Sequence, residues 1–227
     1  MKTVTLAHLI VGVLLFSAPV AWGADEVPLK PSPPTMVFYH HSVGTCYLEN
    51  GLAEVAKRHG YNLAPVDFKP TSNCACDLQD WFASNPSSMT GNVLVKSCFP
   101  CSNLWSDDEV SRSRACYRQL RAQAAQHGAN LYIISPTPYD RAEMEQNGWR
   151  IDARRGADLM DSLETGHAVD PFLNVNRVLR DVGGGLPYLA ETYASRPGDS
   201  HPNDAGCRAV VKAIDSWLPY VAGKTPK

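Results

Sequence analysis

Ser42 stands where a nucleophile could be presented. It follows an apolar, β-rich run at residues 35–39 and precedes a stretch with helical spacing of apolar residues. A side chain at such a strand-to-helix turn can project above a sheet, where the amides of Val43 and Gly44 would face a developing oxyanion. Gly44 has no Cβ, so a ligand or a neighbouring chain could come close to it. Taken alone, the pattern is more typical of a helix N-cap.

An acid and a base follow near the other end of the chain. Asp199 and His201 are two residues apart, and Pro202 stiffens the turn that presents the imidazole. A general base needs such fixed presentation, and a carboxylate can hold its tautomer. Together with Ser42, these residue types predict acyl transfer through a serine nucleophile. The alternative is that Asp199 and His201 only occupy the start of a helix.

The cysteines suggest a different chemistry. Cys98 and Cys101 follow an expected strand with the C-x-x-C spacing of thiol–disulfide oxidoreductases, in which a helix N-terminus activates the first thiol. The structural alternative is that they bond to one another or to a loop partner such as Cys116. The chain holds seven cysteines, an odd number, so at least one lies outside an intrachain disulfide. Their connectivity cannot be derived from the sequence.

His40 and His41 raise the question of a metal site. Adjacent residues of a strand point to opposite faces, so both imidazoles cannot easily bind one ion. Packing around Ser42 is the expected role of this pair, and no metal is predicted.

Apolar runs and turn residues predict alternating strands and helices. Strands are expected at residues 35–39, 63–68, 92–95, 131–134 and 167–170. Helices are expected from about Leu48 to Gly60, at 107–127 and 151–164, and from Pro202 onward. Residues 69–91, rich in Pro, Ser, Asn and Cys, are expected to form a long loop pinned by disulfides.

This alternation predicts a parallel sheet covered by helices on both faces. In such sheets, ligands bind beyond the carboxyl ends of the strands. Segments 40–46, 96–103 and 135–140 follow three of the expected strands, so we expect them to form the functional site.

The residues around Ser42 and around His201 form two sequence blocks that resemble those of the SGNH/GDSL hydrolase superfamily. The resemblance is to a divergent branch whose first block is His-His-Ser-x-Gly. The similarity extends over about residues 36–220. The matching residues are His40, His41, Ser42 and Gly44 in the first block, and Asp199, His201, Pro202, Asn203 and Gly206 in the last.

The resemblance implies an α/β fold, a three-layer α/β/α sandwich with a five-stranded parallel sheet similar to flavodoxin. It implies ester hydrolysis through an acyl-serine intermediate. Ser42 would be the nucleophile, His201 its base and Asp199 the orienting acid, with backbone amides near Ser42 and Gly44 binding the oxyanion. No metal ion or organic cofactor is implied.

The sequence departs from the family pattern at two places. The family's acid lies three residues before the histidine, where this chain has Gly198, so a Ser-His dyad is the alternative to a triad that includes Asp199. The family's Gly-x-Asn-Asp block has no clean match. Segment 96–103 takes its place, and Asn103 is the expected side-chain oxyanion donor, with Ser97 as the alternative.

The first residues predict export. Lys2, a short apolar run at 9–16 and small residues at Ala21 and Gly23 are typical of a secretory signal, with an uncleaved anchor as the alternative. We therefore divide the chain into a cleaved signal (1–23), a Pro-rich leader (24–34) and a hydrolase-like domain (35–222), and expect a secreted or periplasmic protein.

The composition excludes some classes of binding partner. The net charge is −2 and the chain lacks the clustered Lys and Arg of nucleic-acid or membrane-surface binders. We expect a small-molecule or carbohydrate ester as substrate, no nucleic acid and no stable membrane insertion. Trp81 or Trp105 could stack on a sugar ring. A non-catalytic binding domain on the same fold is a further alternative.

Overall fold

A five-stranded, wholly parallel sheet organises the protein, in the order β2-β1-β3-β4-β5. The computed structural model describes residues 32–68, 74–167, 169–180 and 187–222, so the expected signal sequence and nearly all of the leader lie outside the described residues. Residues 33–227 form one compact unit, which is the unit described below. The strands are β1 (Thr35–His40), β2 (Asn62–Asp67), β3 (Asn92–Lys96), β4 (Asn130–Ile134) and β5 (Phe172–Leu173).

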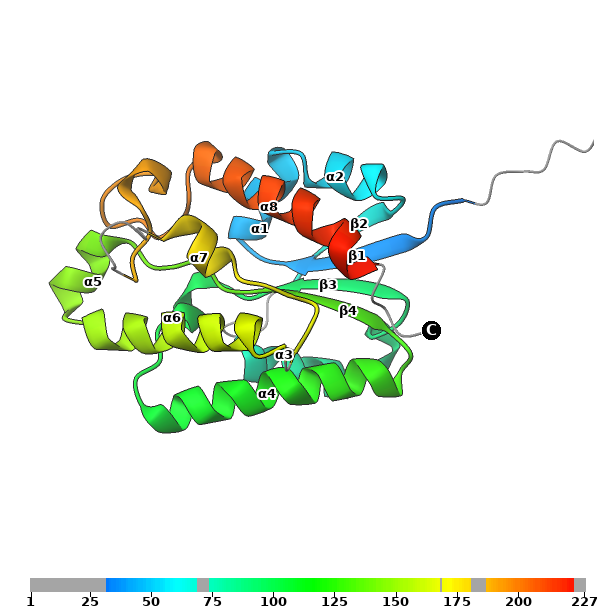
Figure 1. Cartoon of the computed structure of the whole chain (residues 1–227), viewed down its shortest axis with the longest axis horizontal. Coiled ribbons are helices and arrows are strands. Elements are labelled where there is room, and N and C mark those ends of the chain that lie inside the picture. The colour runs from blue at the N-terminus through cyan, green and yellow to red at the C-terminus, as the bar shows by residue number, and fades with distance from the viewer. Residues whose placement is uncertain (1–31, 69–73, 168, 181–186, 223–227) are drawn as a thin grey trace, which may run out of the picture. The chain divides into compact units, whose positions relative to one another are not determined.

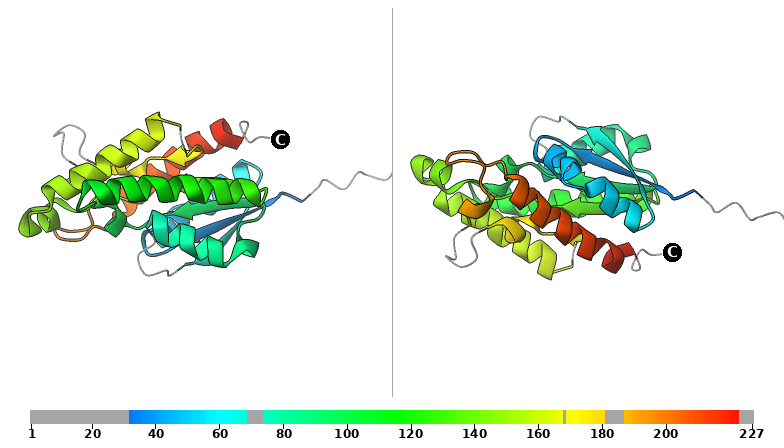
Figure 2. Two further views of the ribbon diagram at one scale, coloured as in Figure 1. Left: turned by 90° about the horizontal axis from the view of Figure 1, so that it is seen from below. Right: turned by 90° about the horizontal axis from the view of Figure 1, so that it is seen from above.

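Helices cover both faces of this sheet (Figure 1). One face carries α1 (Val43–Glu49), α2 (Leu52–Arg58), α7 (Val175–Leu179) and α8 (Asp204–Ala222). The other face carries α3 (Ala75–Ser84), α4 (Asp107–Gln126) and α6 (Arg150–Thr165). Figure 2 shows the second layer from below and the first from above. The three-layer α/β/α sandwich is therefore confirmed, and its strand order is that of flavodoxin-like folds.

The side chains of the strands explain why both faces are covered. Along β3, Val93 and Val95 pack toward α3 and α4, whereas Leu94 between them packs toward α1 and α8. All three are fully buried. A strand that is apolar on both faces must be covered on both faces, as in other parallel sheets.

The remaining elements are short. Helix α5 (Arg141–Asn147) follows β4, and three 3₁₀ turns lie in the connecting segments that the structure describes. These turns are η1 (Pro86–Ser88), η2 (Phe99–Ser102) and η3 (Glu191–Tyr193). Helices α5 and α7 were not predicted from the sequence. In the described part of the chain, no helix combines the length and the apolarity that a membrane span requires.

Three expectations about elements were wrong. The expected loop at 69–91 contains helix α3, whose Leu78 and Phe82 lie one turn apart and are buried. The expected strand at 167–170 lies instead at Phe172–Leu173. The expected helix ending near Gly60 is two helices, because Gly51 takes a left-handed conformation (φ 97°) between them.

Three disulfides account for six of the seven cysteines. They join Cys46 to Cys207, Cys74 to Cys101 and Cys76 to Cys116. The last two pin the start of α3, as the cysteine content of this segment indicated. Cys98 lies outside the three disulfides and is buried.

Candidate active site

Ser42 lies at the turn between β1 and α1, in a backbone conformation that few residues other than glycine adopt. Its φ is 49° and its ψ is −102°. Such a conformation costs about 1–3 kcal/mol and persists only where the surrounding structure imposes it. Ser42 makes no side-chain capping hydrogen bond to α1. The N-cap alternative therefore does not explain its side chain.

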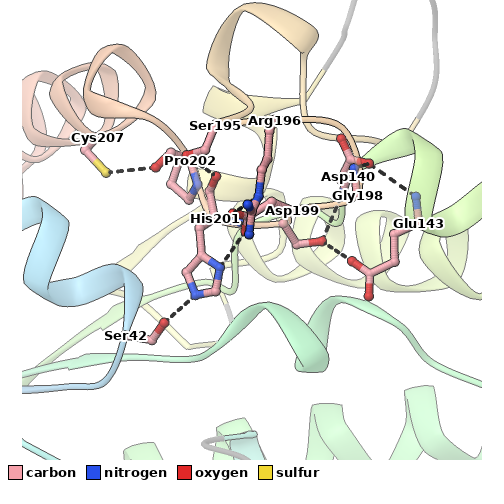
Figure 3. Close-up of polar contacts among 11 residues, drawn as sticks. Ser42, Asp140, Glu143, Ser195, Arg196, Gly198, Asp199, His201, Pro202 and Cys207 are labelled. Carbon is pink, nitrogen blue, oxygen red and sulfur yellow. Dashed lines mark hydrogen bonds and ion pairs between the residues drawn. The ribbon is translucent and has the colours of Figure 1, made fainter.

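His201 meets Ser42 directly. Its Nε2 lies 2.6 Å from Ser42 Oγ, although the two residues are 159 positions apart in the chain (Figure 3). The side chain of His201 is 45% exposed, so a substrate could reach this pair from solvent. A hydroxyl at this distance from an imidazole can transfer its proton to the ring as it attacks an electrophile.

Asp199 completes the hydrogen-bonded series. Its Oδ1 lies 2.8 Å from His201 Nδ1 and also accepts the backbone N–H of His201 at 3.0 Å. Partial burial alone would raise the pKa of the Asp199 carboxyl, but the hydrogen bonds from His201 outweigh it, and the pKa is lowered. The two-residue spacing therefore brings the carboxylate onto the ring, despite its departure from the family pattern.

The residues after His201 hold the turn that carries it. Asn203 donates through Nδ2 to the carbonyls of Thr192 and Ala194, and its Oδ1 accepts the Gly206 N–H at 3.0 Å. A Cβ on Gly206 would lie 2.9 Å from Pro202 Cβ, so this glycine permits the close packing of the turn on α8. Asn203 and Gly206 thus shape the backbone on which His201 is presented.

Gly44 is closely packed within the turn. Its N–H donates to the His41 carbonyl at 3.1 Å, and is therefore engaged within the turn. A Cβ on Gly44 would lie 2.3 Å from His40 Cβ, which is closer than any tolerable contact. The missing side chain of Gly44 therefore admits the side chain of His40.

Asn103 is buried, and both polar atoms of its side chain have no hydrogen-bond partner among the described residues. It lines a cavity of about 470 Å³ together with Tyr117 and Met160 on the α4 and α6 side of the sheet. The described contacts do not include one between Asn103 and Ser42 or His201. The alternative donor, Ser97, has its hydroxyl 3.2 Å from that of Tyr117.

His40 and His41 are in different environments, as the strand geometry predicts. His40 is buried and stacks on Phe38, and burial lowers its pKa. His41 pairs with Asp67 at 3.0 Å on the surface. Within the described ranges, no three His, Cys, Asp or Glu side chains converge where they could hold a metal ion.

The C-x-x-C segment is not a disulfide pair. Cys101 bonds to Cys74 near the start of α3, and Cys98 lies apart from the three bridges. The segment between them forms η2, whose Phe99 contacts the His201 ring with centroids 5.2 Å apart. Cys101 is thus bonded to another segment, as the structural alternative for the C-x-x-C pair allowed, although its partner is Cys74 and not Cys116. The oxidoreductase hypothesis gains no support.

Several residues around the site were missed by sequence reasoning. In the sequence, Phe99 stands only as a spacer between Cys98 and Cys101. Asp140 and Ser200, which are buried beside the Asp199 loop, belong to no motif. Lys96 is fully buried at the end of β3, and burial lowers its pKa to about 8. The only sequence signal for Lys96 is that it is a charged residue at the end of an apolar run.

The likeness of this chain to known proteins lies in its structure and not in its sequence. No family model matches the sequence, and no curated protein matches it in sequence. An acetyl xylan esterase, AlAXEase, superposes with a TM-score of 0.56 at 15% identity, over 80% of this chain and 98% of that chain. A catalytic mutant of Axe2, an acetylxylan esterase from Geobacillus stearothermophilus, gives 0.54 at 15% identity, over 82% and 94%. At this identity, the similarity shows a shared fold.

Proposed function

We propose that the protein is a serine ester hydrolase that acts through an acyl-enzyme. The observation that carries this proposal is the contact of 2.6 Å between Ser42 Oγ and His201 Nε2, with Asp199 2.8 Å behind the ring. This is the arrangement in which a hydroxyl becomes a nucleophile at neutral pH, because the base accepts its proton during attack and the acid orients the base.

The reaction has two halves. Ser42 Oγ attacks the carbonyl carbon of the ester while His201 Nε2 accepts its proton. His201 then donates that proton to the departing alcohol oxygen, and the acyl group stays on Ser42. In the second half His201 takes a proton from a water molecule, which attacks the acyl carbon; the bond to Ser42 Oγ then breaks, His201 returns the proton to Ser42 Oγ, and the acid leaves. Asp199 accepts the Nδ1–H of His201 throughout and favours the imidazolium that forms in each half.

The tetrahedral oxyanion requires hydrogen-bond donors. The first backbone amides of a helix have no acceptor within the helix, so the start of α1, immediately after Ser42, offers N–H groups beside the nucleophile. The Gly44 amide is engaged with His41, which leaves Ser42 and Val43 as the backbone donors that we propose. Asn103 stays the proposed side-chain donor, supported by its buried and unbonded carboxamide.

For the substrate, we propose an ester of a small acid, such as an acetyl group on a carbohydrate. The structural neighbours named above are acetyl xylan esterases. Trp105 is 51% exposed, which leaves part of its ring available to a sugar, whereas Trp81 packs among Phe68, Phe82 and Tyr39. The three disulfides fit a protein that folds in an oxidising compartment, and we propose export to such a compartment.

The test uses Ser42→Ala in the full domain. We expect hydrolysis of p-nitrophenyl acetate to fall at least about 10³-fold, because loss of a nucleophile removes the covalent route. Covalent labelling by a fluorophosphonate probe should disappear, and peptide mapping of the labelled wild type should identify Ser42. An acetylated xylo-oligosaccharide assayed in parallel tests the carbohydrate proposal.

The control is Ser87→Ala, which removes an exposed serine in η1. It should keep both the activity and the labelling. Labelling that persists in Ser42→Ala, or a wild-type protein that neither reacts with the probe nor cleaves any ester, would contradict the proposed function. In the second case, a non-catalytic binding domain would remain.

A further inference from the structure

The loop that carries Asp199 and His201 is held by the start of helix α5. Asp140 Oδ1 accepts the Gly198 N–H at 2.7 Å, and Ser200 Oγ accepts the Asp140 N–H at 2.9 Å. Ser200 Oγ also donates to Glu143 Oε2 at 2.6 Å. Figure 3 shows Asp140, Glu143 and Gly198 beside Asp199. The contacts involve the residues immediately before and after Asp199, so they bracket the acid.

Asp140 is suited to this role by its burial. It is 5% exposed, and its Oδ1 accepts three backbone N–H groups, those of Ala142 (2.8 Å), Glu143 (3.2 Å) and Gly198 (2.7 Å). Two of these donors belong to the first turn of α5 and the third to the loop. One carboxylate oxygen therefore caps the helix and holds the loop, and an ionised carboxylate makes stronger hydrogen bonds than a neutral group.

Ser200 lies between the acid and the base in sequence but points away from both. It is 2% exposed, and its hydroxyl both accepts from Asp140 and donates to Glu143. A buried hydroxyl with both its roles satisfied is costly to displace. Ser200 therefore fixes the backbone on one side of Asp199, as Gly198, in a left-handed conformation with φ 80°, fixes it on the other.

We infer that Asp140, Ser200 and Glu143 form a positioning clamp that keeps the Asp199 carboxylate on His201 Nδ1. Asp199 lies in an irregular segment between η3 and α8, where no helix or strand sets its direction. With only one residue between acid and base, a small rotation of the Gly198–Ser200 backbone would swing the carboxylate off the ring. The clamp opposes that rotation, and so allows an acid only two residues before the histidine to stay in contact with His201 Nδ1.

This inference rests on the proposed function, since it concerns the geometry of the same reaction. The clamp residues touch neither the substrate nor the reacting atoms, so their effect must pass through Asp199. Misplacement of a catalytic group by about 1 Å can cost on the order of 10²-fold in rate. We therefore expect kcat to respond and KM to stay nearly constant.

The first measurement compares Ser200→Ala, Asp140→Ala and Asp140→Asn on p-nitrophenyl acetate. Ser200→Ala and Asp140→Ala should lower kcat about 10–100-fold, with KM within about twofold of wild type. Asp140→Asn keeps an oxygen that can accept the Gly198 N–H, so its kcat should lie between those of Asp140→Ala and the wild type. Wild-type kcat in Ser200→Ala and Asp140→Ala would overturn the inference.

The second measurement is a double-mutant cycle with Asp199→Asn. If the clamp acts through Asp199, adding Ser200→Ala to Asp199→Asn should lower kcat by no more than about twofold further, because coupled residues are not additive. If Ser200→Ala lowers kcat by its full factor in that background, the clamp is structural only and the inference is wrong.

A matched control separates the clamp from the helix cap. Ser106→Ala removes the side-chain N-cap of α4, which accepts the Glu109 N–H at 3.2 Å, far along the chain from the Asp199 loop. It should lower the melting temperature as Asp140→Ala does, without lowering kcat. Failure of the proposed function would appear differently, as absent serine labelling in the wild type.

Discussion

At the scale of single residues, the protein buries a lysine at the end of β3, close enough to His40 to act on that imidazole electrostatically. Lys96 has no exposed surface, and its Nζ donates to the Ser97 carbonyl at 2.8 Å. Burial disfavours the charged form and lowers its pKa from 10.5 to about 8. Water would solvate the protonated Lys96 better than the folded protein does. Burial of this charge therefore lowers the free energy of unfolding by an amount that depends on pH.

Lys96→Met tests that cost. Below about pH 8 both the folded and unfolded states hold the proton, and the folded state carries the full penalty. Between about pH 8 and 10.5 the unfolded chain binds more protons, so wild-type stability rises with pH relative to the variant. Lys96→Met should be more stable than wild type by about 1–3 kcal/mol at pH 7, and this gain should shrink as the pH approaches 10.5.

Urea denaturation at pH 7 and pH 10 measures this effect. Lys57→Met, at an exposed position of α2, serves as the control and should show no pH-dependent difference from wild type. A gain in Lys96→Met that is equal at both pH values would show that the Lys96 charge is not penalised by burial.

At the scale of elements, α3 is held by two disulfides with different consequences. Cys76–Cys116 joins α3 to the middle of α4. Cys74–Cys101 joins the start of α3 to η2, whose Phe99 rests against the His201 ring. Both bridges should stabilise the fold by restricting the unfolded chain, but only the second holds an element that contacts the candidate base.

Removing each bridge separately should distinguish these roles. The double variants Cys76→Ser/Cys116→Ser and Cys74→Ser/Cys101→Ser should each lose about 3–4 kcal/mol of unfolding free energy, because the closed loops are of similar length. Only the second pair should also lower kcat, by about 3–10-fold, as Phe99 loses its fixed position. Denaturant melts and steady-state kinetics measure the two effects. Equal kcat in both variants would mean that η2 does not position His201.

At the scale of the whole molecule, the site depends on the meeting of two distant segments. Ser42 directly precedes α1, and His201 lies shortly before α8. The two helices pack on the same face of the sheet, and Cys46–Cys207 links them across 161 residues of chain. This bridge lies within two turns of both side chains, so it constrains the fold and the site together.

Cys46→Ser/Cys207→Ser should therefore be the most damaging of the disulfide variants. A closed loop of this length predicts a loss of about 5 kcal/mol, against 3–4 kcal/mol for the bridges at α3. We also expect a lower kcat, because α1 and α8 would be free to shift relative to one another. Denaturation of the three double variants under identical conditions checks the ranking, and a smaller loss than for Cys76→Ser/Cys116→Ser would contradict it. Adding a reductant should likewise lower the unfolding free energy and kcat of the wild type.

The sequence by itself determined the elements whose signals are local. The strands at 35–39, 92–95 and 131–134 are short apolar runs bounded by breakers, and such runs are recognisable without tertiary contacts. The parallel sheet followed from their alternation with helices. The local pattern at Ser42 and at His201 is by itself that of a helix start, and the prediction that they act together came from the resemblance of their two blocks to the SGNH/GDSL hydrolases.

Only the tertiary structure decided what depends on contacts between distant residues. The disulfide pairing, the engagement of the Gly44 amide and the clamp at Asp140 all require knowing which segments are adjacent in space. Helix α3 was hidden by its polar and cysteine-rich composition, because its stability comes from burying Leu78 and Phe82 against the core and from two bridges. Asp199 shows the difference most clearly. Spacing alone argued against it, and the turn that brings its carboxylate to His201 is set by contacts with α5, 58 residues away along the chain.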